Sequence, residues 1–181
     1  MDDKKLIALA KLAKRGDKNA FSELYEYYIT PIFRFVYFRV RNRADAEDLT
    51  QGIFLKIWNA MPKYKQKKNP FSSWLYSVAR NSVIDFWRKK KDWNIGELGE
   101  GLIKDDGRPL DELIDEEQEL ITIKKMMELL TEEQQEVIVF KYIDELSNKE
   151  ISLILDKKED AVRQLQSRAI KTLREYYKKE L

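Results

Sequence analysis

One segment near the end of the chain carries side chains that can read DNA bases. On the outer face of a predicted helix lie Arg163, Gln164, Ser167, Arg168 and Lys171. In the major groove Arg can contact guanine through O6 and N7, Gln can contact adenine, and Lys is suited to phosphate. This face lacks the acidic residues that an ordinary solvated helix mixes into its exposed side. The pattern therefore favours DNA reading over a plain helical hairpin.

A second segment, residues 63–91, combines a basic loop with an aromatic-rich helix. Single-stranded nucleic acid is held by positive charge along its backbone and by aromatic contacts to unstacked bases. Tyr64 and Trp87 are the candidates that we expect to be exposed, whereas Trp74 and Phe86 are expected in the core. A polar face at helical spacing follows the loop and consists of Ser77, Asn81, Asp85 and Arg88.

Much other chemistry is excluded because the 181 residues include no His and no Cys. A Ser-His-Asp triad, a thiol nucleophile and a Cys/His zinc site are all impossible. The acids that could hold a divalent ion stand at irregular spacing in a Gly-rich stretch, where carboxylates are usually just solvated: Asp105, Asp106, Asp111 and Glu112. We therefore predict no metal site and no cofactor, and an enzyme remains possible at this point only if carboxylates, Lys, Tyr or Ser carry the reaction.

The elements that must position these side chains all read as helices, so the predicted fold class is all-α. Asp17 is a plausible N-cap, and Pro31 is expected to kink the helix that follows. The next helix has an inner stripe of Ala46, Leu49, Ile53 and Ile57, which leaves Asp45, Asp48 and Gln51 on another face. A third helix is predicted to begin near Ser72.

The C-terminal part reads as a helix-turn-helix. Helical patterning resumes over residues 117–130, and capping boxes open helices at Thr131 and Ser147. The first of these helices is predicted to bury Val137, Ile138 and Tyr142. A turn at 156–158 leads to the last helix, with an inner face of Val162, Leu165, Ala169 and Leu173.

Charge is segregated along the chain although the formal net charge is only +2. Residues 1–92 carry 20 basic and 10 acidic side chains, whereas residues 93–136 carry 4 basic and 14 acidic side chains. We therefore predict two small helical domains, 1–92 and 120–181, joined by an acidic flexible linker at 93–119. No stretch approaches the ~20 apolar residues of a membrane span, so a soluble, intracellular protein is expected.

Two ordered blocks of the chain resemble conserved regions of bacterial sigma factors. Residues 45–54 and 71–85 resemble the second conserved region, and residues 130–134 through 168–174 resemble the fourth. With these two regions and a linker, the chain resembles the extracytoplasmic-function (ECF) subgroup. The resemblance implies a DNA-binding initiation subunit of RNA polymerase, without catalysis of its own.

The resemblance also implies roles for individual residues. Asp48 and Gln51 would face the largest subunit of core RNA polymerase. The melted −10 element would meet Tyr64 and the loop after it, with Asn81, Asp85 and Arg88. The −35 element would be contacted by the outer face of the last helix, Arg163, Gln164, Ser167, Arg168 and Lys171. Gly52 departs from the acidic residue usual in the family, and Asp156-Lys157 departs from the usual Gly-Ile/Val turn.

Further expectations concern partners and the linker. The resemblance implies binding to core RNA polymerase, to promoter DNA and to an anti-sigma factor, which can hold a cytoplasmic sigma factor at the membrane. Residues 97–119 are hypothesised to act as a polyanion mimic in the polymerase channels. The alternatives are a stand-alone helix-turn-helix regulator, a carboxylate-dependent metal enzyme acting on nucleic acid, and a scaffold without DNA contact.

Overall fold

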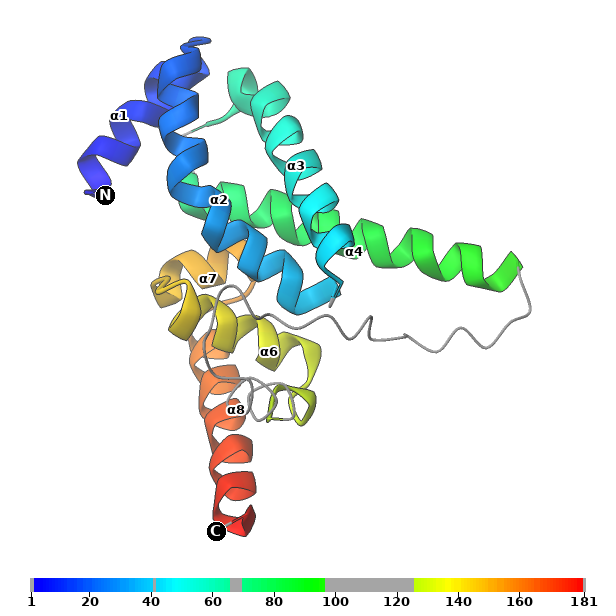
Figure 1. The fold of residues 1–181 in the computed structure, drawn as a ribbon. Coiled ribbons are helices and arrows are strands. Elements are labelled where there is room, and N and C mark those ends of the chain that lie inside the picture. The colour runs from blue at the N-terminus through cyan, green and yellow to red at the C-terminus, as the bar shows by residue number, and fades with distance from the viewer. Residues whose placement is uncertain (1, 41, 66–69, 97–125, 181) are drawn as a thin grey trace. The chain divides into compact units, whose positions relative to one another are not determined.

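The computed structural model describes residues 2–40, 42–65, 70–96 and 126–180, and these form helices, short turns and no strand. The chain divides between residues 105 and 106 into two compact units (Figure 1). The all-α prediction is therefore confirmed for the described residues. No helix in these ranges is long and apolar enough to cross a membrane.

The first unit is built around α2, Lys18–Val40, which packs against α1, Asp3–Lys14, and α3, Arg43–Ala60. Asp17 accepts hydrogen bonds from the backbone N–H groups of Asn19 and Ala20, as predicted for an N-cap. Pro31 lies inside α2, which continues through it as one helix. The helix α1 was not predicted, although its buried residues recur at helical spacing: Leu6, Leu9, Ala10 and Ala13.

A short 3-10 turn, η1, Met61–Lys63, follows α3, and α4 spans Phe71–Gly96. The predicted domain boundary at residue 92 falls inside α4, because no helix-breaking residue occurs before Gly96. The remaining linker residues, 97–119, lie outside the described residues, as do 117–125 of the predicted helix over 117–130.

The second unit comprises α6, Glu132–Ile138, the π-helical turn η2, Val139–Ile143, α7, Asn148–Leu155, and α8, Glu159–Glu180. Both predicted capping boxes are present, one between Thr131 and Gln134 and one between Ser147 and Glu150. The helices close over a core whose fully buried members are Val137, Phe140, Ile151, Val162 and Ala169.

The predicted burial of Tyr142 is wrong, because 58% of this residue is exposed. The π-helical turn adds a residue to the helical turn and shifts the register after Ile138. Phe140 consequently takes the inward position, at 0% exposure, and Tyr142 points away from the core.

The turn between α7 and α8 forms without the usual Gly. Asp156 adopts the left-handed conformation, with φ 52° and ψ 47°, and its backbone N–H donates to the carbonyl of Ser152. The side chain of Lys157 pairs with Glu133 of α6, with Nζ and Oε1 2.9 Å apart. An ion pair to α6 thus stands where the resemblance led us to expect an apolar turn residue.

Candidate nucleic-acid interface

The outer face of α8 is set by the residues that α8 buries. Val162 and Ala169 are fully buried against the rest of the unit, which turns the opposite side of the helix to solvent. All five side chains of the predicted −35 face are exposed: Arg163, Gln164, Ser167, Arg168 and Lys171. Their exposure fits the prediction, and their contact with DNA remains a prediction.

Acidic residues accompany this face at its two ends. Arg163 pairs with Asp160, with Nη2 and Oδ1 2.8 Å apart, and with Glu159, with Nη1 and Oε2 3.7 Å apart. The hydrogen bond and charge of Asp160 raise the pKa of Arg163. Lys171 lies 3.9 Å from Glu175. The expected absence of acids therefore holds only for the middle of the face.

The middle of the face is left available for a ligand. Within the described part of the chain, the side chains of Gln164, Ser167 and Arg168 form no hydrogen bond or ion pair. Polar groups without protein partners can exchange water for base edges without breaking an existing contact. This is the arrangement that direct base reading requires.

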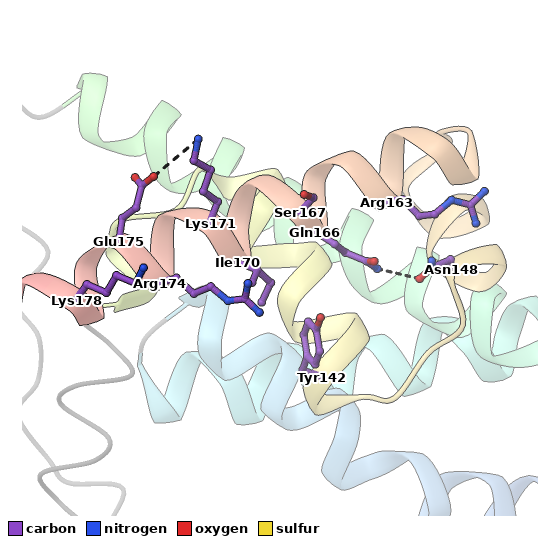
Figure 2. A pocket seen from close by; sticks show the side chains of 10 residues that line it. All are labelled: Tyr142, Asn148, Arg163, Gln166, Ser167, Ile170, Lys171, Arg174, Glu175 and Lys178. Carbon is purple, nitrogen blue, oxygen red and sulfur yellow. Dashed lines mark hydrogen bonds and ion pairs between the residues drawn. The ribbon is translucent and has the colours of Figure 1, made fainter.

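A groove of about 620 Å³ runs along one flank of α8 (Figure 2). From α8 it includes Arg163, Ser167 and Lys171, but not Gln164 or Arg168. Its other lining residues are Tyr142, Asn148, Gln166, Ile170, Arg174, Glu175 and Lys178. Sequence reasoning missed these residues, although the basic ones continue the spacing of the predicted face.

A hydrogen bond fixes the start of α7 beside α8. The amide of Gln166 donates from Nε2 to Oδ1 of Asn148, 2.9 Å away (Figure 2). Asn148 is the first residue of α7 and follows its N-cap, Ser147. The two helices of the helix-turn-helix are therefore joined at the groove by a side-chain contact in addition to their apolar packing.

The predicted −10 face lies on α4. Asn81 and Arg88 are exposed and Asp85 is half-buried, with Arg88 Nη2 3.0 Å from Asp85 Oδ1. Ile84 lies between them on the same side of the helix and is 42% exposed. The structure thus brings the three predicted residues together and adds an apolar side chain to their face.

Tyr64 does not belong to an exposed surface, and the expectation that its ring is available to DNA is wrong. It is only 3% exposed, and its ring centroid lies 4.9 Å from Trp74 and 5.7 Å from Phe71. Burial raises the pKa of Tyr64 to about 12. Lys14 donates from Nζ to the Tyr64 carbonyl at 2.6 Å, which ties this part of the loop to α1.

Three other aromatic residues of this segment are neither fully buried nor fully exposed. Trp87 is half-buried, and so are Trp74 and Phe86, which were expected in the core. The Lys90 ammonium lies 5.6 Å from the Trp87 ring centroid and 5.4 Å from that of Phe86. Sequence alone did not separate these cases, because an aromatic residue amid lysines can either pack inward or face solvent.

A polar face on α3 carries the predicted polymerase contacts. Asp48 and Gln51 are exposed, opposite the fully buried Ala46, Ile53 and Ile57. Leu55, one helical turn after Gln51, is 62% exposed on the same side. A Cβ added at Gly52 would meet no atom within 4 Å, so the glycine is not required by packing.

Comparisons with known proteins agree with the two units. The family model Sigma-70 region 2 matches residues 24–92, and the model Sigma-70, region 4 matches residues 120–173. The ECF RNA polymerase sigma factor BldN of Streptomyces coelicolor is 29% identical over 95% of this chain and 66% of its own length. The ECF RNA polymerase sigma factor SigW of Bacillus subtilis is 35% identical over 45% of this chain and 43% of its own length.

Two solved structures share the fold. CnrH in complex with the cytosolic domain of CnrY has a TM-score of 0.73 and 22% identity, covering 99% of this chain and 100% of that chain. The sigma factor RpoE in complex with the anti-sigma factor NepR, from Bartonella quintana, has a TM-score of 0.74 and 21% identity. The match covers 87% of this chain and 96% of that chain. The chain spans about two thirds of the length of BldN and less than half that of SigW. The chain belongs to the sigma-70 family, in its extracytoplasmic-function group.

Proposed function

We propose that this protein is an alternative sigma factor. It binds core RNA polymerase, recognises the −35 and −10 elements of a promoter and promotes DNA melting. The observation that carries the proposal is the face of α8, where Gln164, Ser167 and Arg168 are exposed without protein partners above a buried inner stripe. The match to the Sigma-70, region 4 model over residues 120–173, which include most of this helix, supports the proposal.

The first unit supplies the other two contacts of the proposed function. Asp48 and Gln51 form a polar face for core polymerase, and the exposed Leu55 adds an apolar side chain to that face. Asn81, Asp85 and Arg88 face the melted −10 strand. Tyr64 is removed from this set, because its ring is buried against Phe71 and Trp74.

The proposed role requires no catalytic residue in this chain, because initiation uses the polymerase's own active site. Anti-sigma factors are proposed as further partners, since RpoE is seen bound to the anti-sigma factor NepR. The proposed location is the cytoplasm, where a membrane-held anti-sigma factor could retain the protein.

Run-off transcription with core RNA polymerase tests the proposal. Promoter-specific transcripts are expected only when this protein is added, and Gln51→Ala should lower core affinity without changing the fold. Arg168→Ala should weaken −35 binding by about 1–3 kcal/mol if Arg168 contacts a base. Sequence-specific DNA binding without polymerase-dependent transcripts would instead identify a stand-alone helix-turn-helix regulator.

A further inference from the structure

A row of side chains on α8 extends well beyond the predicted reading residues. Arg163, Ser167, Lys171, Arg174 and Lys178 follow one another at spacings of four, four, three and four. Because an α-helix turns about 100° per residue, this spacing keeps all five on one side. At about 1.5 Å per residue the row is roughly 22 Å long.

The row forms one wall of the groove along α8, and its other wall comes from different elements. Tyr142 of η2 and Asn148 of α7 lie across from the basic side chains (Figure 2). Tyr142 is 58% exposed, so its hydroxyl can donate to a ligand in the groove. The groove therefore combines four cationic side chains and the Glu175 carboxylate on the α8 wall with neutral polar groups on the other wall.

The uncompensated charge of the groove lies at its C-terminal end. Arg163 and Lys171 are both next to carboxylates, those of Asp160 and Glu175. Arg174 and Lys178, in contrast, form no ion pair with any residue that the structure describes. The strongest attraction for an anion is thus offered by two residues outside the predicted −35 face.

The shape of the charge distribution indicates which anion fits. A small anion is held by donors that converge on a point, whereas these cations are strung along a line. A DNA strand presents one phosphate per 3.4 Å of helix axis, so a row of roughly 22 Å can follow several of them. Gln164 and Arg168 lie on the neighbouring side of α8, so they can reach base edges while the row follows the backbone.

We propose that this groove seats the phosphate backbone of one DNA strand flanking the −35 element. Arg174 and Lys178 contact phosphates beyond the base-reading residues, and the Tyr142 hydroxyl donates to a phosphate from the opposite wall. The inference rests on the proposed function and extends its DNA footprint. It assigns affinity without sequence preference to the C-terminal half of α8, and base discrimination to the N-terminal half.

Binding of the full-length chain to two duplexes across a salt series tests this assignment. One duplex carries a −35 element mapped by run-off transcription, and the other carries the same bases scrambled. For R174A/K178A, the slope of log K against log salt should fall by about two, since each lost phosphate contact removes about 0.9. Affinity should fall equally on both duplexes, so the preference for the −35 duplex should be unchanged.

Two further variants sharpen the result. Tyr142→Phe should weaken binding to both duplexes and leave the salt slope unchanged, because it removes a neutral donor. K4A/K11A removes the same net charge from exposed positions of α1 and should change the slope much less. Circular dichroism should show native helix content for each variant.

The inference is overturned if R174A/K178A binds both duplexes with unchanged slope and affinity. It is also overturned if the loss is confined to the −35 duplex, because the two residues would then read bases. If the wild-type chain binds both duplexes equally tightly and R174A/K178A still lowers the slope by about two, −35 recognition is contradicted while the backbone contacts are supported. Failure of the proposed backbone contacts and failure of the proposed −35 recognition therefore give different results.

Discussion

Arg163 Nη2 and Asp160 Oδ1 lie 2.8 Å apart in the first turn of α8. The predicted DNA contact nearest the start of α8 is therefore already engaged by a carboxylate on the same side of the helix. Both side chains are largely exposed, so the pair can open toward solvent. DNA binding through Arg163 must compete with Asp160 for the guanidinium.

Asp160→Asn is expected to tighten binding to the −35 duplex at low salt by about two- to fivefold, the range typical of an exposed ion pair. The substitution frees Arg163 and removes a negative charge that repels phosphate. Fluorescence anisotropy with a labelled duplex measures the change. Glu132→Gln, at an exposed position of α6, removes the same charge and should have a smaller effect. Equal effects of the two substitutions would show that net charge alone is responsible.

Asp156→Gly is expected to stabilise the second unit by about 0.5–1 kcal/mol, because Asp156 adopts a positive φ that glycine adopts without steric cost. Asp156→Ala should destabilise the same unit, since alanine lacks the local hydrogen bonding of Asp. Thermal unfolding followed by far-UV circular dichroism measures both. All four Trp residues lie between positions 58 and 93, so Trp fluorescence reports separately on the first unit. A change seen only in fluorescence would contradict the prediction.

Gly52→Ala is expected to stabilise the first unit by about 1 kcal/mol, because glycine is disfavoured in a helix interior and the added Cβ meets no atom within 4 Å. Gly16→Ala is the matched control. It also has open space around its Cβ, but its φ of +92° makes alanine strained there. Denaturant unfolding followed by Trp fluorescence should therefore shift in opposite directions for the two variants. A gain from both substitutions would show that helix propensity is not the cause.

Alkaline pH is expected to destabilise the first unit through Tyr64. Its pKa is raised to about 12 in the folded protein, against about 10 for an unfolded chain. Between these values the unfolded state loses the proton and the folded state keeps it, so stability falls as pH rises. The fall should be smaller in Tyr64→Phe, measured as the denaturation midpoint from pH 9 to about 12. Equal slopes in both proteins would show that Tyr64 does not contribute.

The local elements of this protein follow from the sequence. Both capping boxes and the Asp17 cap depend on residues within about four positions of one another, and the buried stripe of α3 depends on apolar residues that recur at helical spacing. The exposure of the α8 face was predictable for the same reason, because Val162 and Ala169 define the inner side of the helix. The family resemblance rested on the same local blocks and was confirmed by the two family models.

Only the tertiary structure decided which aromatic residues are exposed and where the groove lies. Tyr64 is buried because Trp74 and Phe71 of α4 cover its ring, and a sequence pattern does not contain that contact. Tyr142 is exposed because a π-helical turn shifts the register that the hydrophobic spacing indicates. The groove joins residues from η2, α7 and α8, which are up to 36 positions apart between Tyr142 and Lys178. Local spacing determines the face that a helix presents, whereas packing between helices determines which side chains share a site.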